Sequence, residues 1–97
     1  MEPAIANKQP SARTDRNLFH IKVFSPFETF FDGEAYSLTA ENETGPFDVL
    51  AGHANFLTVL LPCVIKIKTQ NKDITSLPIE RGVLHVHENR ATVFLNI

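Results

Sequence analysis

The 97-residue sequence contains one cysteine, only four glycines and no apolar run long enough to cross a membrane. The single cysteine, Cys63, excludes an internal disulfide and is typical of a reducing compartment. It lies beside Pro62 in an apolar run, which predicts a buried and inert thiol. The glycines are too widely spaced for a phosphate-binding loop. The longest apolar run, residues 56–65, is about half the length of a membrane helix, so we expect a soluble, cytoplasmic protein.

The sequence also lacks a concentration of charge of one sign. The formal net charge is −2, and the nine basic and eleven acidic residues are intermixed. Without a basic stripe, binding to nucleic acid has no electrostatic support. Glu41 and Glu43 belong to a polar loop, and no pair of carboxylates is placed for acid–base catalysis. We therefore expect no active site and no cofactor.

Alternation of apolar and polar residues is the pattern that is present. Residues 1–17 lack it and are interpreted as a flexible tail, whereas residues 18–97 are predicted to form one domain. Asp32-Gly33 is predicted to form a hairpin, and Pro78 predicts that its strand lies at a sheet edge or contains a bulge. Turns recur at intervals of roughly 8–12 residues, which favours an all-β sandwich or barrel. Strands are expected near residues 19–23, 29–31, 36–40, 47–50, 56–60, 65–68, 74–79, 84–87 and 93–97, and those at 47–50 and 56–60 are expected to be buried.

The four histidines raise the question of a metal site. His85 and His87 lie two residues apart on one face of a predicted strand, and Glu88 follows directly, as at the start of a cupin-type site. Glu88 would point to the opposite face, however, and no histidine follows residue 87 to complete the ligand set. A solvated outward face is the favoured interpretation, with a small metal-dependent β-barrel enzyme as an alternative. His20 is interpreted as a plain surface histidine.

The most informative stretch is GPFDVLAGHANFLTVLL, residues 45–61. Gly45-Pro46 is interpreted as one turn, and residues 51–54 as a second turn between two apolar runs. Gly52 can adopt positive φ without steric cost, so a sharp reversal there would leave His53 at a corner. We therefore predict a docking corner that presents His53.

Three segments in order resemble the N-terminal β domain of the epsilon subunit of F-type ATP synthases, which is named delta in mitochondria. Residues 24–26 (FSP) and 31–33 (FDG) match a strand that ends in Val-Ser-Pro and a Phe-x-Gly hairpin. Residues 45–58 match the motif Gly-x-x-Gly-Ile-Leu-Pro-Gly-His-Ala-Pro-Leu-Leu-Thr. Residues 84–86 (LHV) and 89–95 (NRATVFL) match the closing Leu-x-Val and Asn-x-Val-Thr-Val-Leu pattern.

This resemblance implies a flattened β-sandwich of about ten short, mostly antiparallel strands and a rotor component without catalytic activity. It implies docking to the gamma subunit and to the c-subunit ring of a proton- or sodium-translocating synthase. The implied location is cytoplasmic and peripheral, on the inner face of a bacterial energy-transducing membrane. A stand-alone β-sandwich that binds another protein is the alternative. The implied interface residues are Ser25, Gly45, Pro46, Phe47, Asp48, Val49, Gly52, His53, Ala54 and Phe56.

Departures from the family pattern concentrate before the corner. Pro46 replaces the usual acidic residue, Asp48 the second glycine, and Ala51 and Asn55 the two prolines around Gly-His-Ala. Because Pro46 offers no carboxylate, the resemblance supports a contact with the c ring less strongly than a contact with the gamma subunit. Glu43 and Asp48 are the candidates to supply the missing carboxylate. The C-terminal helical hairpin of the family is absent from the sequence, through truncation or because the form is short. We thus expect no ATP binding and no inhibition of hydrolysis by this chain.

Overall fold

The computed structural model describes residues 17–95, which form eight β-strands in a single curled sheet. The predicted all-β class is confirmed, with eight strands among the described residues where about ten were expected. Apart from Asn17, the predicted tail lies outside the described residues. Within the described part, no helix is long and apolar enough to span a membrane. The strands are β1 (Phe19–Phe24), β2 (Thr29–Asn42), β3 (Gly45–Leu50), β4 (Phe56–Leu60), β5 (Cys63–Thr69), β6 (Ile74–Ile79), β7 (Gly82–His87) and β8 (Arg90–Leu95).

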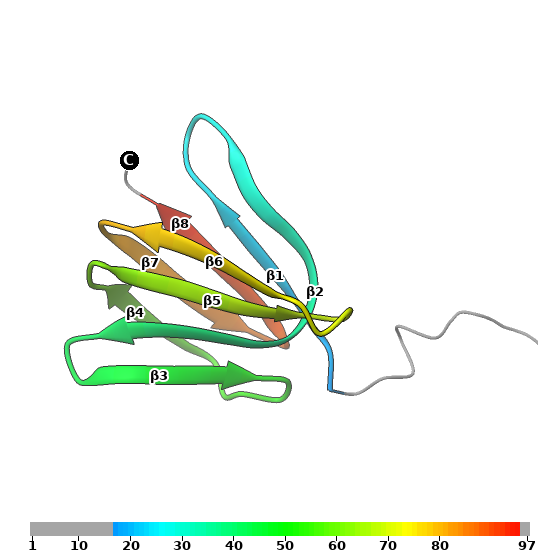
Figure 1. Cartoon of the computed structure of the whole chain (residues 1–97). Coiled ribbons are helices and arrows are strands. Elements are labelled where there is room, and N and C mark those ends of the chain that lie inside the picture. Colours follow the sequence, from blue (N-terminus) through cyan, green and yellow to red (C-terminus); the bar gives the residue numbers. More distant parts are fainter. Residues whose placement is uncertain (1–16, 96–97) are drawn as a thin grey trace, which may run out of the picture.

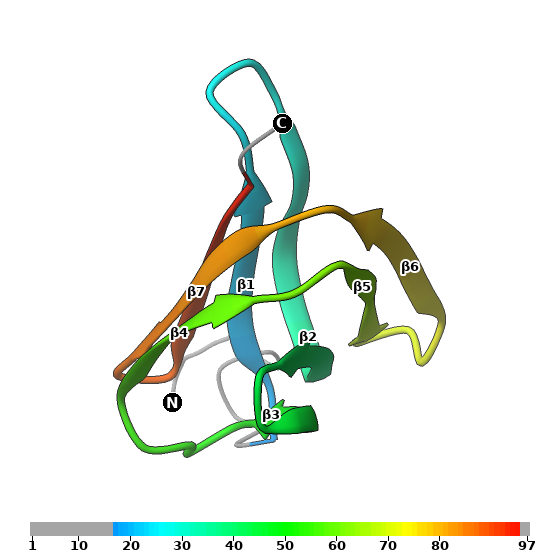
Figure 2. The same cartoon turned by 90° about the vertical axis from the view of Figure 1, so that its left-hand side faces the viewer.

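The long strand β2 bends and divides the sheet into two facing layers (Figures 1 and 2). Its first half pairs with β1, and its second half pairs with β3 and β5. The register against β5 shifts between Ala35 and Ser37, and such a bulge bends a strand. Layer A consists of β4, β7, β8, β1 and the first half of β2; layer B consists of the second half of β2 with β3, β5 and β6. Within layer A, β8 lies between β7 and β1 and pairs in parallel with β1.

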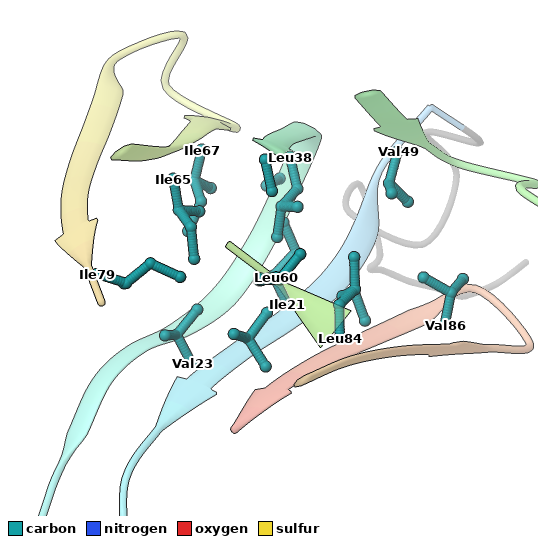
Figure 3. Packing of buried hydrophobic residues seen from close by; sticks show 14 of the residues in the cluster. Ile21, Val23, Leu38, Val49, Leu60, Ile65, Ile67, Ile79, Leu84 and Val86 are labelled. Atoms are coloured by element: carbon teal, nitrogen blue, oxygen red, sulfur yellow. The ribbon is translucent and has the colours of Figure 1, made fainter. Parts of the chain in front are cut away.

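The hydrophobic core fills the space between the two layers (Figure 3). Alternate residues point inward in every strand except β2, where the bulge separates the buried Ala35 and Leu38 by three positions. The predicted alternation is confirmed in β1, β5, β7 and β8. The two outer faces are left to the intervening side chains, and these faces offer surface for partners. Layer A contributes Ile21, Val23, Leu60, Leu84 and Val86, and layer B contributes Leu38, Val49, Ile65, Ile67 and Ile79.

The predicted hairpin at Asp32-Gly33 is wrong, because both residues lie inside β2 and pair with β1. A tight hairpin of this type needs positive φ, and Gly33 does not adopt it. The chain instead reverses at residues 25–28, where Ser25 Oγ accepts hydrogen bonds from the backbone amides of Phe27 (3.2 Å) and Glu28 (3.3 Å). Two expected strands therefore merge into the 14-residue β2.

The predicted burial of the strands around the corner is also wrong in part. Only alternate residues of β3 and β4 face the core, and Leu50, Leu57 and Val59 are exposed. Each of these strands has one face on the core and one toward the outside, so half of its apolar residues remain at the surface. The edge position of β6, which contains Pro78, is confirmed by the strand order.

Candidate functional site

The connection between β3 and β4 is a sharp corner, as predicted. The backbone amide of His53 donates to the carbonyl of Leu50 (3.1 Å), and Gly52 has φ +83°. Positive φ at the third position of such a turn favours glycine. Residues 52–55 are all exposed, so the corner presents His53 on the surface.

Two asparagine side chains fasten this corner to the β7–β8 turn. Asn89 Oδ1 accepts from the backbone amide of Gly52 (2.8 Å), and Asn55 Oδ1 accepts from the backbone amide of Glu88 (2.8 Å). Asn89 Nδ2 also donates to the carbonyl of Leu18 (3.3 Å). Glu88 and Asn89 have φ of 47° and 63°, the two positive values that a two-residue hairpin turn requires. The β7–β8 turn therefore holds an otherwise exposed loop in one conformation.

Aromatic contacts support the corner from the core side. The ring of His53 lies 4.8 Å from the ring of Phe56, which in turn packs edge-on against Phe47 at 6.0 Å. His53 Nδ1 lies 2.7 Å from the carbonyl oxygen of Ala54, which can only accept, so Nδ1 is the donor. The ring orientation is thus fixed, and Nε2 is the nitrogen left for a partner.

The turn at the other end of β3 uses a more local device. The reversal lies at Glu43-Thr44, and Gly45, predicted as part of a turn, begins β3 with φ +117°. Asn42 Oδ1 accepts from both the backbone amide (3.0 Å) and the hydroxyl (2.6 Å) of Thr44. Asn42 Nδ2 also donates to Thr58 Oγ1 on β4 (3.1 Å), which attaches the turn to layer A.

The residues implied by the resemblance do not form one patch. Gly52, His53 and Ala54 are exposed at the corner, and Phe56 packs behind them. Gly45 lies at the opposite end of β3, and Ser25 lies at the end of β1 that is remote from the β7–β8 turn. Pro46 and Asp48 are exposed on the outer face of layer B, whereas Phe47 is half-buried and Val49 is fully buried in the core.

Carboxylates do lie near Pro46 on the outer face of layer B. Glu41 is the cross-strand partner of Pro46, and Asp48 follows it on the same face. Asp48 Oδ1 already accepts a hydrogen bond from Thr39 Oγ1 at 2.5 Å. Glu43 and Asp48 were expected from the sequence as substitutes for the acidic residue that Pro46 replaces. Asp48 lies next to Pro46, whereas Glu43 lies in the turn between β2 and β3. Glu41 is a third candidate that sequence reasoning assigned to a solvated loop.

Sequence reasoning missed an exposed apolar row on the outer face of layer A. The strand registers place Val59 beside Val83, Val83 beside Phe94, and Phe94 beside Phe24. The Phe24 and Phe94 rings pack edge-on at 5.3 Å, and Val59 is 57% exposed. The sequence signal that could have revealed this row was the presence of apolar residues at positions that the apolar–polar alternation assigns to the outside of the sheet. Contiguous exposed apolar surface of this kind is typical of protein–protein contacts.

A hollow of about 500 Å³ lies beside the corner on the layer B side. Its lining includes the apolar Leu50 and Ala51 and the two basic residues Lys68 and Lys72. Such a hollow suits an acidic side chain of a partner better than a basic one.

The other chemical candidates do not form a site among the described residues. The rings of His85 and His87 lie 5.8 Å apart on the outer face of layer A, and residues 17–95 contain no group of three or more His, Cys, Asp or Glu arranged for a metal. Cys63 is half-buried where a buried thiol was predicted, and this partial burial raises the pKa of the thiol. A raised pKa leaves less thiolate, which agrees with the predicted inert cysteine.

Comparison with known families decides the assignment. Residues 18–96 match the model of the ATP synthase delta/epsilon chain β-sandwich domain. The chain belongs to this family. The predicted resemblance is therefore confirmed.

Individual relatives agree with the delta/epsilon assignment. The chain is 35% identical over 75 residues to an ATP synthase epsilon chain of Sulfurimonas denitrificans, covering 77% of this chain and 58% of the relative. It is 31% identical over 80 residues to an epsilon chain of Clostridium perfringens, covering 82% and 60%. The chain therefore spans somewhat more than half the length of these relatives.

Solved structures share the fold of this delta/epsilon domain. A chain in the Euglena gracilis mitochondrial ATP synthase structure of OSCP, F1 and c-ring superposes with a TM-score of 0.74 at 17% identity, covering 82% of this chain and 51% of that one. A chain in the Tetrahymena thermophila central stalk and c-ring structure gives 0.66 at 20% identity, covering 80% and 63%. At sequence identities this low, the superpositions show that the fold is shared and nothing more.

Proposed function

We propose that this delta/epsilon domain is a non-catalytic rotor component of the central stalk in a proton- or sodium-translocating F-type ATP synthase. In this role it binds the gamma subunit and couples it to the c-subunit ring. Family membership over residues 18–96 supports the assignment. The observation that carries it is the Gly-His corner, which is exposed and yet fastened through Asn55 and Asn89.

A rigid exposed corner suits a domain that must transmit rotation. Binding through a preorganised loop avoids the free-energy cost of ordering that loop on association. His53 offers Nε2 for a hydrogen bond, and Phe56 supports its ring from behind. Such buried or supported aromatic anchors dominate the binding energy of many interfaces. The corner and the outer apolar row are therefore our candidate contacts for the gamma subunit.

Contact with the c ring is assigned to the outer face of layer B near Pro46. Proline supplies no carboxylate, so Glu41 and Asp48 are the side chains there that could pair with a basic group of the ring. In this assembly the domain would lie peripherally on the inner face of an energy-transducing membrane.

Co-purification with the gamma subunit encoded by the same organism tests the proposal. We expect a stable complex with the full chain at micromolar concentration. The His53→Ala and Phe56→Ala variants should each weaken it by about tenfold or more, equivalent to about 1.4 kcal/mol. Ser76→Ala, on the outer face of β6, is the matched control and should bind like the unmodified chain. Thermal unfolding of each variant separates lost binding from lost structure, because Phe56 is half-buried.

Absence of any complex with the unmodified chain at that concentration would reject the rotor assignment. It would favour a stand-alone β-sandwich that binds another protein. Normal binding by both corner variants would leave the rotor assignment in place but move the gamma contact away from the corner, toward the outer apolar row.

A further inference from the structure

His20, predicted to be a plain surface histidine, is instead held between two carboxylates on the outer face of layer A. Its Nε2 lies 2.6 Å from Asp32 Oδ1, and its Nδ1 lies 2.9 Å from Glu34 Oε2. The histidine side chain is 28% exposed, and those of Asp32 and Glu34 are 50% and 38% exposed. Both nitrogens of one imidazole ring therefore have an acidic partner on the neighbouring strand.

The strand pairing explains how this arrangement forms. Glu34 is the cross-strand partner of His20, whereas Asp32 faces Lys22 and reaches His20 diagonally. The ammonium group of Lys22 lies over the Phe24 ring, 5.1 Å from its centroid. Asp32 can take this position only because residues 32–33 continue β2 and do not form the expected hairpin.

The number of protons on the ring follows from the chemistry of its partners. An ionised carboxylate can only accept hydrogen bonds, so each ring nitrogen must donate. A neutral imidazole carries one N–H, whereas the imidazolium carries two. We infer that His20, Asp32 and Glu34 form a proton-dependent clamp across β1 and β2, closed when His20 is protonated. When the proton leaves, one nitrogen lone pair faces a carboxylate, and one of the two hydrogen bonds is lost.

The surrounding charges set the sign of the effect. On its own strand His20 is followed by Lys22, and on β8 it is paired with Arg90, beyond which lies His87 on β7. These groups oppose a positive charge on His20, but the two carboxylates are in direct contact with the ring, and Lys22 is engaged with Phe24. Protonation therefore stabilises the folded state. The contribution is present while the ring carries a proton on both nitrogens and is lost when the ring is neutral.

This inference is independent of the proposed function, because it concerns the folded domain alone. Histidine is the side chain whose charge changes most readily between about pH 5 and pH 8. A clamp of this kind would make the first hairpin of the domain tighter when the surrounding solution acidifies.

Thermal unfolding of the full chain at about pH 5.5 and about pH 8 tests the clamp. The His20→Gln variant should lower the melting temperature more at pH 5.5 than at pH 8, with a difference of about 2–4 °C for a partly exposed pair in a domain of this size. His85→Gln is the matched control, because His85 is an exposed histidine on the same outer face. Its melting temperature should follow the pH profile of the unmodified chain.

Removing the carboxylates provides a second test. In a background carrying Asp32→Asn and Glu34→Gln, the pH-dependent effect of His20→Gln should disappear. If His20→Gln and the unmodified chain keep parallel pH profiles, the clamp is rejected. Nitrogen-15 NMR of the unmodified chain gives an answer even if a variant fails to fold. The clamp predicts that both N–H protons of the charged His20 ring are hydrogen-bonded to carboxylates, and N–H protons that exchange freely with water would overturn it.

Discussion

The two turns that flank β3 both depend on a glycine with positive φ, yet they are held in different ways. The Gly45 turn is fixed mainly by Asn42, whose side chain bonds Thr44 two residues away. The Gly52 corner is fixed by Asn89, which is 37 residues away in the chain. The first turn can form from local interactions, whereas the second takes its final form only when the β7–β8 turn is in place.

This difference assigns a role to each turn. The Gly45 turn has one side-chain bond to another strand, from Asn42 to Thr58, and its other side-chain bonds are local. A corner held through Asn89 and Asn55 is part of the cooperative fold, so its conformation persists as long as the domain is folded. The corner is thus the better candidate for a contact that must withstand torque.

Substitution of Asn89 should have the largest effect on stability. Asn89→Ala removes the bonds to Gly52 and Leu18 and places alanine at φ 63°, so we expect a loss of about 2–3 kcal/mol in the free energy of unfolding. Asn89→Gly tolerates this φ and should lose only about 1–2 kcal/mol, from the hydrogen bonds alone. Urea unfolding measures both variants. An Asn89→Gly variant as stable as the unmodified chain would show that the side chain does not hold the corner.

The contrast between the two turns also explains what the sequence could predict. Period-two alternation identified the strands β1, β5, β7 and β8, because the inward residues of each recur at every second position. The turn at Gly52 was recognisable because a glycine between two apolar runs is a local turn signal. The roles of Asn55 and Asn89 were not, since their partners are 33 to 71 residues away.

The hairpin prediction at residues 32–33 was wrong because pairing between β1 and β2 overrode a local turn signal. Asp-Gly is a strong hairpin signal, but Asp32 and Gly33 pair with β1 and extend β2. The same pairing brings Asp32 to His20, which no local pattern indicates. The outer apolar row was overlooked for a related reason: apolar residues in 56–60 were assigned to the core, and only the sheet order shows which of them face outward.

The glycine positions offer a sharper test of the same contrast. Gly45→Ala and Gly52→Ala should each lower the free energy of unfolding by about 1–2 kcal/mol, because both residues have positive φ. No atom lies within 4 Å of an added Cβ at either position, so the loss would come from backbone strain and not from a clash. Their coupling to Asn89 should differ. Combined with Asn89→Gly in a urea-unfolding cycle, Gly52→Ala should be non-additive by about 0.5 kcal/mol or more, because the two residues share a hydrogen bond. Gly45→Ala should be additive. Equal coupling at both glycines would remove the distinction between the turns.

Asn55 should give the smallest effect and bears on the departure from the family pattern, which has proline at this position. Asn55→Ala removes the exposed hydrogen bond to the Glu88 amide and should cost about 0.5–1 kcal/mol. Asn55→Pro removes the same bond, but it also lowers the conformational entropy of the unfolded chain. Where proline fits the native conformation, this stabilises the folded state by about 0.4–1 kcal/mol. Asn55 lies outside the left-handed region, as proline requires. We therefore expect the proline variant to be more stable than the alanine variant in urea unfolding. The order would show that asparagine and proline fix this corner by two routes, one through a bond to the β7–β8 turn and one through the chain itself. The reverse order would mean that proline does not fit the corner as it is built here.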